Sequence, residues 1–351
     1  MAPHGGSAGP TPTGPTRSGP AGISIVVPTL GRPSLATLLR ALAQADPVGV
    51  PVEVLLVDDR PDHRAELAVP PGLPVKVLTG GAAGPAAARN TGWRAARHEW
   101  VAFLDDDVVP DPDWLRRLTA DLTVPRHVGG SQGRVRVPLP AGRRPTDWER
   151  STAGLADAQW ITADMAYRRA ALADAGGFDE RFPRAYREDA ELAYRVRRAG
   201  WRLVRGARAI THPVRPEGPW ISVRTQRGNA DDALLRRLYG PGWRTVLDIP
   251  PGRRPWHVAT TATGAAAVFC AATSTRRRDR PARRAAAVVA GAGWVILTTR
   301  FIAARVKPGP RTTRELTTMA VTSVLIPPVA SVHWLRGWWR ARGARPLAGP
   351  R

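Results

Sequence analysis

Short apolar runs alternate with helix-like stretches over the first 104 residues. Four runs have the length and apolar content of buried strands, at 23–27, 52–57, 75–78 and 100–104. Leucines spaced at helical intervals predict a helix over 33–42, and a second helix is predicted over about 85–97. The order strand, helix, strand, strand, helix, strand predicts an α/β fold: an open, mostly parallel sheet with helices on its faces.

Three of these predicted strands end in polar residues. The first runs into Pro28-Thr29-Leu30-Gly31-Arg32, the second into Asp58-Asp59 and the fourth into Asp105-Asp106-Asp107. In open α/β sheets, ligands collect at the carboxyl ends of the strands. We therefore expect a ligand site at this edge of the sheet.

The three consecutive aspartates carry the strongest chemical signal. Carboxylates this close repel one another unless a cation lies among them, and oxygen ligands suit a hard divalent metal. Alternation along a strand would turn Asp105 and Asp107 to the same side. The alternative is an acidic loop in which Asp111 or Asp113 caps a helix beginning at Trp114. The other polar strand ends favour the metal-site hypothesis.

A second acidic pair, Glu188-Asp189, begins another predicted helix, which ends near Gly200. Acidic residues in a first turn are favourable at the positive end of the helix dipole. The pair also has the chemistry of an acid or base at a site. The residues alone leave both interpretations open.

Six motifs in order resemble those of the family 2 glycosyltransferases with the GT-A fold. They are Pro28-Thr29-x-x-Arg32, Val57-Asp58-Asp59, Gly84-Pro-Ala-Ala-Ala-Arg89-Asn90-x-Gly92, Leu104-Asp-Asp-Asp107, Gly177-Phe-Asp-Glu and Glu188-Asp189. The resemblance covers about residues 22–215. It implies an inverting glycosyltransferase of the hexosyltransferase class, which moves a sugar from a nucleoside diphosphate sugar to an acceptor hydroxyl.

The resemblance also implies roles on the donor side. Asp105 and Asp107 fall in the motif that positions Mg²⁺ or Mn²⁺ on the diphosphate, and Asp106 is secondary. The residues that fall where the family contacts the nucleotide are Thr29, Arg32, Asp58, Asp59, Gly84, Arg89 and Asn90. For Arg89 and Asn90 the alternatives are a surface salt bridge and a satisfied amide.

On the acceptor side, Asp189 matches the general base of the family. A neighbouring carboxylate would push its pKa upward, which suits proton abstraction near neutral pH. Glu188 would orient Asp189 or bind the acceptor, and Asp164 is a further candidate for the acceptor pocket.

Two departures from the family pattern are informative. Processive members carry Gln-x-x-Arg-Trp after the base, whereas this chain has Gln226-Arg-Gly-Asn-Ala. The usual Asp-Asp-Gly-Ser turn is replaced by Asp58-Asp59-Arg60-Pro61. The first difference predicts transfer of a single sugar, and the second puts the detailed nucleotide contacts in question.

Charge is concentrated in the last third of the chain. The net charge is +23, and the residues from 251 onward hold 18 Arg and Lys against two acidic residues. Only Lys76 and Lys307 of the 52 basic residues are lysines, which indicates a GC-rich, actinobacterial-like genome as much as selection. The single Cys270 excludes an internal disulfide framework. Residues 1–21 are rich in Gly and Pro without a secretory apolar run, so we expect a disordered tail and a cytoplasmic catalytic part.

Three uncharged or weakly charged stretches, 258–275, 285–304 and 319–339, approach the length of a spanning helix. A hairpin of the first two would place the basic connector 276–284 outside, against the usual preference for basic loops inside. We therefore expect helices on the cytoplasmic leaflet, with arginines on anionic headgroups and Trp334, Trp338 and Trp339 at the interface. The alternative is a compact helical cap packed on the enzyme.

This placement suits an acceptor carried on a lipid, as in cell-envelope glycan synthesis. The expected organisation is a tail over 1–21, a GT-A domain over 22–215, a helical extension over 216–250 and a basic helical region over 251–351. A sugar-nucleotide pyrophosphorylase is the alternative enzyme, although the loop after the first strand lacks the Gly-rich phosphate loop it needs. A nucleic-acid-binding protein would explain the charge but not the acidic motifs, so we expect no nucleic-acid partner.

Overall fold

The first four strands lie side by side and parallel in the computed structural model, which describes residues 19–63, 65–274 and 280–346. They are β1 (Ile23–Thr29), β2 (Val52–Asp58), β3 (Val75–Thr79) and β4 (Trp100–Leu104), in the order β3-β2-β1-β4. All four match the predicted runs to within two residues. The register pairs Thr29 with Asp58, so the polar strand ends meet at one edge.

The other half of the sheet was not predicted. It consists of β5 (Val109–Pro110), β6 (Val128–Arg136), β7 (Asp164–Arg168) and β8 (Arg202–Thr211), and the full order is β3-β2-β1-β4-β7-β6-β8-β5. β7 runs antiparallel to β4 and β6, so the sheet is mixed. β6 has no apolar run because its glycines lie against neighbouring side chains: a Cβ on Gly130 would be 2.8 Å from Leu203.

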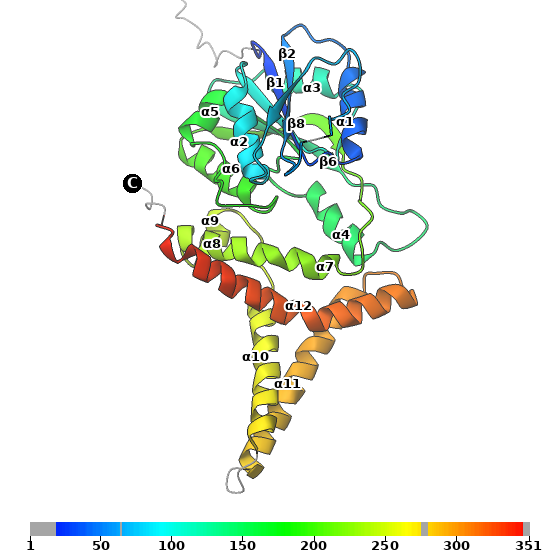
Figure 1. The fold of residues 1–351 in the computed structure, drawn as a ribbon, viewed down its shortest axis with the longest axis vertical. Helices are drawn as coiled ribbons and strands as arrows, with labels where there is room; N and C mark the ends of the chain where they lie inside the picture. The colour runs from blue at the N-terminus through cyan, green and yellow to red at the C-terminus, as the bar shows by residue number, and fades with distance from the viewer. Residues whose placement is uncertain (1–18, 64, 275–279, 347–351) are drawn as a thin grey trace, which may run out of the picture.

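Helices cover both faces of this sheet (Figure 1). One face packs against α1 (Ser34–Ala43) and α3 (Trp114–Asp121), and the other against α2 (Pro85–Ala95), α5 (Arg169–Asp174) and α6 (Glu188–Arg198). The predicted helices over 33–42, over 85–97 and from Glu188 correspond to α1, α2 and α6. The sequence therefore predicted the α/β GT-A class correctly.

The C-terminal half adds a helical layer and a projecting hairpin (Figure 1). The short helices are α4 (Asp147–Ala153), α7 (Ile221–Arg224), α8 (Asn229–Tyr239) and α9 (Trp243–Val246), and the long ones are α10 (Arg254–Thr273), α11 (Arg280–Val306) and α12 (Thr313–Arg340). α12 packs closely on α8, since a Cβ on Gly337 would lie 2.5 Å from Ala230. α12 also continues through Pro327 and Pro328, with Ile326, Pro327 and Ala330 buried.

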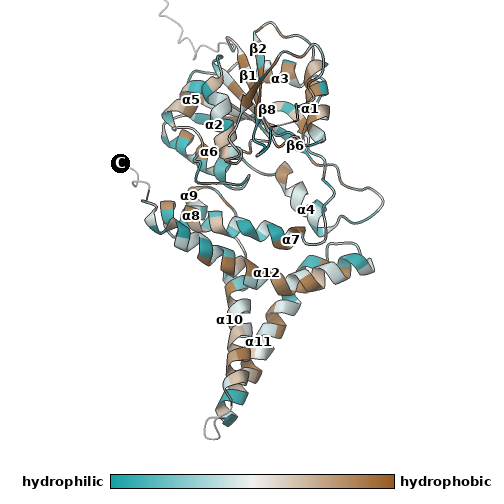
Figure 2. Cartoon of the chain, in the orientation of Figure 1, coloured by the Kyte–Doolittle hydropathy of each residue, from teal (hydrophilic) through white to brown (hydrophobic). Residues whose placement is uncertain are grey.

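α10 and α11 form an antiparallel hairpin that extends away from the α/β domain, and its middle is apolar (Figures 1 and 2). Within the described residues, two helices are long and apolar enough to cross a membrane, Arg280–Val306 and Thr313–Gly343. Only 6% of the apolar stretch of the first is buried. Residues 1–18 of the predicted tail and residues 275–279 of the predicted connector lie outside the described residues. The four-part division of the chain stays a prediction.

Candidate functional site

Asp106 is the most deeply buried member of the aspartate triplet and organises the loop after β1. Its carboxylate accepts hydrogen bonds from Thr29 Oγ1 at 2.7 Å and from Arg32 Nη1 at 2.8 Å. Thr29 Oγ1 in turn accepts from the backbone N–H of Gly31, which has a left-handed φ of +69°. The structure thus brings Thr29 and Arg32 to the triplet, as the strand-end argument predicted.

Asp105 and Asp107 face different cations. Asp105 is 29% exposed and accepts from Arg89 Nη2 at 2.8 Å. Asp107 is more buried, with its oxygens 3.6 Å from His212 Nε2 and 3.2 Å from Arg215 Nε. Burial raises the pKa of Asp107, the charge of Asp105 raises it further, and His212 and Arg215 oppose both effects. Both carboxylates are therefore engaged by the protein at the edge of the site.

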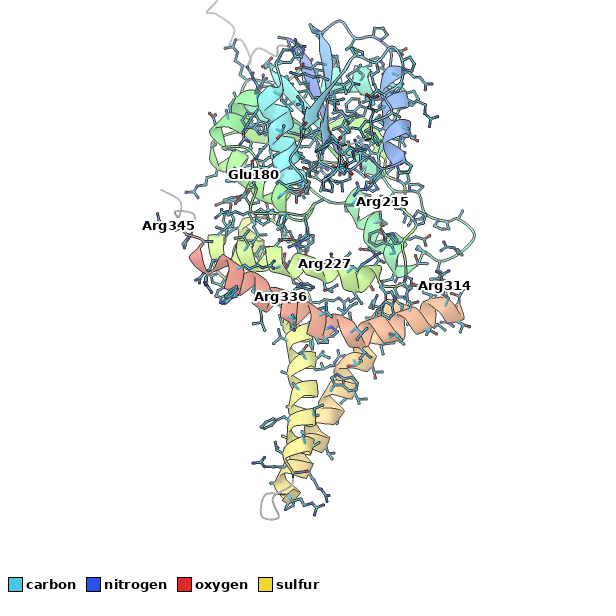
Figure 3. The ribbon with its side chains drawn as sticks, in the orientation of Figure 1. Glu180, Arg215, Arg227, Arg314, Arg336 and Arg345 are labelled. Carbon is cyan, nitrogen blue, oxygen red and sulfur yellow. The ribbon has the colours of Figure 1, made fainter. Side chains whose placement is uncertain are left out.

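Sequence reasoning missed His212 and Arg215. They follow directly after β8, a strand that was not predicted, so nothing linked them to the triplet. Figure 3 shows Arg215 where the α/β domain faces the helical layer. The available signal was a polar pair after a ten-residue strand that carries several arginines. Asp113, one of the two proposed helix caps, lies at the start of α3. Its carboxylate accepts a hydrogen bond from Arg117 Nε at 2.6 Å and makes no capping hydrogen bond to a backbone N–H of the helix.

Asp58 is held at the end of β2 by the residue that departs from the family pattern. Arg60 donates to both of its oxygens, at 2.9 Å from Nε and 2.7 Å from Nη2, and His63 Nδ1 lies 3.1 Å away. These bonds keep the pKa of Asp58 well below its ordinary value, so it stays ionised. Arg60 thus clamps Asp58 at the position where the family has glycine.

Asp59 holds the Gly-rich loop that begins α2. Its carboxylate accepts from the backbone N–H groups of Ala83 at 3.1 Å and Gly84 at 3.0 Å. Gly84 has a φ of +96°, and a Cβ there would lie 2.7 Å from the carbonyl oxygen of Pro183. Only glycine fits at that position, and Asp59 fixes the loop above it.

Arg89 is a buried bridge between the two acidic motifs. Its side chain is 2% exposed, and it donates from Nη2 to Asp105 at 2.8 Å and from Nη1 to Glu188 at 2.9 Å. The guanidinium also lies 5.6 Å from the ring centre of Phe178. Arg89 thus forms salt bridges, as the alternative interpretation held, but they lie inside the protein instead of on its surface. They link Asp105 to the start of α6.

Asn90 is a satisfied amide inside the protein, so the structure corrects its expected place against the nucleotide. Its Nδ2 donates to the Phe178 carbonyl at 2.9 Å and to Glu180 at 2.7 Å, and its Oδ1 accepts from the N–H of Phe178 at 2.8 Å and from Trp93 at 2.8 Å. The side chain is 1% exposed. Asn90 therefore fixes the Gly177-Phe-Asp-Glu motif to α2.

The Glu188-Asp189 pair begins α6 in an apolar setting. Glu188 is buried, and burial raises its pKa to about 8, with the charge of Asp189 adding to the effect. Asp189 is half-buried, accepts from the N–H of Thr162 at 3.2 Å, and has its pKa raised by burial. The pKa is raised, as predicted, but the largest cause is burial and the carboxylate that adds to it is Asp105 instead of the expected neighbour Glu188. Arg187 precedes the pair with a φ of +79° and donates to Asp232 on α8 at 3.0 Å.

Asp164 does not line an acceptor pocket, which corrects the expectation for this residue. It is fully buried, with Arg208 Nε at 2.7 Å and Trp114 Nε1 at 2.9 Å. Asp164 begins β7, which lies in the middle of the sheet, so its carboxylate faces Arg208 of β8. It is one half of a buried ion pair in the core.

The donor set near the triplet suits a metal shared with a substrate. Across the described ranges, no three His, Cys, Asp or Glu side chains are gathered as a complete metal site. Asp105 and Asp107 offer carboxylate oxygens, with the imidazole of His212 beside Asp107. Mg²⁺ is commonly bound by one or two carboxylates together with substrate phosphates. The residues therefore fit an ion that reaches full coordination with a diphosphate.

Two cavities lie between the α/β domain and the helical layer. The larger, about 420 Å³, is lined by α4, residues 214–222 and the start of α12, and it includes Arg215 and Arg314 (Figure 3). The smaller, about 350 Å³, lies at the base of α10 and α11. They share Asp147, Trp148 and Ser222 in their walls. The two cavities thus adjoin the same wall, one beside Arg215 and the other at the base of the hairpin.

Comparison with known proteins agrees with this geometry. Residues 24–182 match the family described as Glycosyl transferase family 2. A pre-mycofactocin glycosyltransferase of Mycobacterium tuberculosis is 36% identical over 136 residues, 34% of this chain and 28% of the relative. The succinoglycan biosynthesis protein ExoO of Rhizobium meliloti is 40% identical over 89 residues, 24% of this chain and 26% of the relative. The matches thus span about a quarter of these relatives' length.

The fold is similar to that of a solved mannosyltransferase, PcManGT from Pyrobaculum calidifontis, in complex with GDP-Man and Mn²⁺. The TM-score is 0.53 at 18% identity, and the alignment covers 95% of this chain and 91% of the other. At this identity the likeness concerns the fold, and it extends beyond the α/β domain into the helical region.

Proposed function

We propose that the protein moves a single sugar from a nucleoside diphosphate sugar to an acceptor hydroxyl, with inversion, because residues 24–182 match the family described as Glycosyl transferase family 2. The observation that carries this proposal is the Arg89 bridge from Asp105 to Glu188. It joins a cluster suited to a departing diphosphate with a pair suited to proton abstraction. The family match also favours transfer over the pyrophosphorylase and nucleic-acid alternatives.

On the donor side, Asp105 and Asp107 would hold Mg²⁺ or Mn²⁺, with His212 beside them. A bound metal supplies a Lewis acid that offsets the charge growing on the leaving diphosphate. Asp106 keeps the β1 loop in place through its hydrogen bonds to Thr29 and Arg32. The nearby arginines add positive charge for the phosphates.

The nucleotide would lie along the neighbouring strand ends. Asp58, kept ionised by Arg60, offers carboxylate oxygens to N–H or O–H groups of base and ribose. Asp59 and Gly84 hold the loop that approaches the diphosphate, and Asn90 acts indirectly by holding the 177–180 motif. Residue 60 thus becomes part of the nucleotide-positioning machinery of this chain.

At the acceptor end, Asp189 takes the proton of the attacking hydroxyl. Its raised pKa makes it a better base than an ordinary aspartate once it is deprotonated. Attack opposite the leaving diphosphate inverts the anomeric carbon in one displacement. Glu188, fixed by Arg89, is a positioning residue that keeps α6 and Asp189 in register with the donor.

We further propose that the helical region places the enzyme on the cytoplasmic face of a membrane. α11 projects away from the α/β domain and is long and apolar enough to cross a membrane, which supports insertion of the α10–α11 hairpin into the bilayer in spite of its basic connector (Figure 2). α12 is also long and apolar enough but more buried, and the interfacial arrangement expected from sequence suits it, because it carries Trp334, Trp338 and Trp339. α10 has 20 residues, about 30 Å of helix, which is the thickness of a hydrocarbon core. A lipid-linked acceptor of cell-envelope glycan synthesis fits this location.

Thermal unfolding with UDP-, GDP- and dTDP-sugars, each with and without Mn²⁺, tests the donor side. We expect stabilisation by sugars of one nucleotide, strengthened by Mn²⁺ and abolished in Asp107→Asn. Asp113→Asn is the matched control, because that aspartate bonds only exposed arginines of α3. Stabilisation by none of the sugar nucleotides would contradict the proposal.

The single cysteine tests the location of the hairpin. Cys270 lies on α10, close to the end of the hairpin that is distant from the α/β domain. In native membrane vesicles we expect Cys270 to resist a water-soluble maleimide and to react after detergent is added. Equal labelling before and after detergent would show that the hairpin lies in water.

A further inference from the structure

The 350 Å³ cavity stands where the apolar hairpin joins the catalytic part. Its walls come from α4, α7, the ends of α10 and α11 nearest the α/β domain and the middle of α12. The lining residues that matter here are Arg150, Ser222, Arg253, His257, Phe301 and Arg305. A molecule lying along the hairpin therefore meets this cavity before it reaches the sheet.

The cavity has more positive charge than its carboxylate neutralises. Three guanidiniums line it, and the one carboxylate, Asp147, is already bound by Arg305 Nη2 at 2.7 Å and Arg150 Nη2 at 3.3 Å. Arg253 makes no ion pair with any described carboxylate. Its guanidinium lies 5.6 Å from the ring centre of Phe301, the ring that Arg305 also approaches to 5.6 Å. Two cations thus converge on one aromatic ring, and of these only Arg305 has a described counter-charge, Asp147, which it shares with Arg150.

Two further features indicate an anion. Arg253 is the N-cap residue directly before the 20-residue helix α10, whose positive dipole end favours negative charge. The hydroxyl of Ser222 is buried in the same wall without a hydrogen-bond partner. A phosphate suits this setting, because its oxygens accept from arginine forks and from a hydroxyl together.

The neighbouring surface is suited to an apolar tail. Trp256 is 59% exposed and Val258 48% exposed, both within the first turn and a half of α10 after Arg253. On α11, Ile296 is 58% exposed on the stretch that leads to Phe301. A phosphate on a hydrocarbon chain could bury its head beside Arg253 and its tail along these side chains.

We propose that this cavity binds the phosphate of a lipid-linked phosphate and so anchors the acceptor. That the ligand is the acceptor rests on the proposed function; the binding itself does not. The 420 Å³ cavity on the other side of the shared wall is lined by Arg215, which contacts Asp107 at 3.2 Å, so the bound phosphate would lie on the side of the donor site. The substrate class is therefore an acceptor that carries both a phosphate and a hydrocarbon tail.

Binding of farnesyl phosphate to the full chain in a non-ionic detergent tests this proposal, with farnesol and inorganic phosphate as separate probes. We expect farnesyl phosphate alone to bind, and Arg253→Gln to weaken it about 10- to 100-fold, as for loss of a charge-assisted hydrogen bond. Arg253→Lys, which keeps the charge without the fork, should fall between the two. Arg300→Gln is the matched control, because this exposed arginine lies on α11 outside the cavity.

Each other outcome overturns the proposal in a distinct way. Equal binding of farnesol would show a purely apolar site, and equal binding of inorganic phosphate would show a site for a free anion. An equal loss in Arg300→Gln would show diffuse attraction to the basic region. If farnesyl phosphate binds but no sugar nucleotide does, the phosphate site is supported and the proposed transferase function is contradicted. If a sugar nucleotide binds but farnesyl phosphate does not, the transferase function is supported and the phosphate site is contradicted.

Discussion

In the α/β domain the bulkiest apolar side chains are the most deeply buried, whereas on α10 and α11 they are largely exposed. Trp100 and Phe103 are fully buried, but Phe269 is 65% exposed and Val288 and Val289 are 71% and 72% exposed. A contiguous apolar surface of this kind marks a place that something apolar covers. The same chain thus has a core that excludes water and a hairpin whose surface requires a non-aqueous partner.

Charge follows the opposite pattern. At the site and in the core, most acidic residues contact a cation: Asp106 contacts Arg32, Asp58 contacts Arg60 and Asp164 contacts Arg208. On α10 and α11, arginines stand mainly at the helix ends, and neither helix contains an Asp or Glu, although Arg305 pairs with Asp147 of α4. Pairing inside the domain preserves geometry for chemistry, and unpaired arginine at the hairpin leaves charge available for a ligand or surface.

The largest expected effect is at the acceptor end of the α/β domain. Asp189→Asn should lower kcat about 10²- to 10⁴-fold, because the amide cannot take the proton. Donor binding, measured as thermal stabilisation by the preferred sugar nucleotide, should be unchanged, since Asp189 bonds only the Thr162 N–H. A variant with full kcat would remove the base assignment.

The next prediction concerns the paired charges of the core. Asp164→Ala should cost about 3 kcal/mol in the free energy of unfolding, because the fully buried Arg208 loses the nearer of its two carboxylates and keeps Asp121 at 3.2 Å. Urea unfolding measures the loss. The exposed Asp157→Ala should change stability by less than about 0.5 kcal/mol. Similar values for both would show that the pair is not a structural element of the core.

The hairpin should respond in the reverse manner. Val289→Asp should weaken binding to phospholipid vesicles by about 2.5–3.5 kcal/mol, the cost of a charge in the hydrocarbon region, measured by flotation. Its unfolding temperature without lipid should match that of Val289→Ala, because the side chain contacts mainly solvent in the protein alone. If Val289→Asp instead lowers the unfolding temperature and leaves flotation intact, the hairpin belongs to a compact cap.

The smallest effect is a change in pH dependence. Burial raises the pKa of Glu188 from 4.5 to about 8, so the folded protein holds a proton that the unfolded chain releases. This contribution to stability is complete below about pH 4.5 and is lost as pH rises through about 8. Glu188→Gln should lack that decline while keeping a bond to Arg89. Parallel stability curves for the two proteins between pH 5 and 8 would contradict this account.

The sequence predicted the elements whose signal is local. β1 to β4, α1, α2 and α6 have apolar runs or helical periodicity, and the order of polar strand ends placed Thr29, Asp58 and the triplet together. β6 and β7 escaped prediction because their stability comes from pairing and from glycines against side chains, not from apolar content.

The sequence predicted many of the residues of the site but fewer of the contacts between them. Asp164 and Asn90 had the right chemistry for a substrate, but burial decides their role, and burial depends on strands and loops distant in sequence. His212 and Arg215 come from the far side of the mixed sheet, so only the folded structure brings them to Asp107.

Arg89 has a consequence for how this protein can change over generations. One guanidinium serves Asp105 and Glu188 at once, and lysine, with a single nitrogen, could not donate to both in the same fork. A substitution at position 89, 105 or 188 therefore changes the contacts of the other two, and we expect the three positions to change together. Sugar preference can change through residues at the edge of the site. A designed change at one of the three coupled positions, in contrast, requires all three to be redesigned.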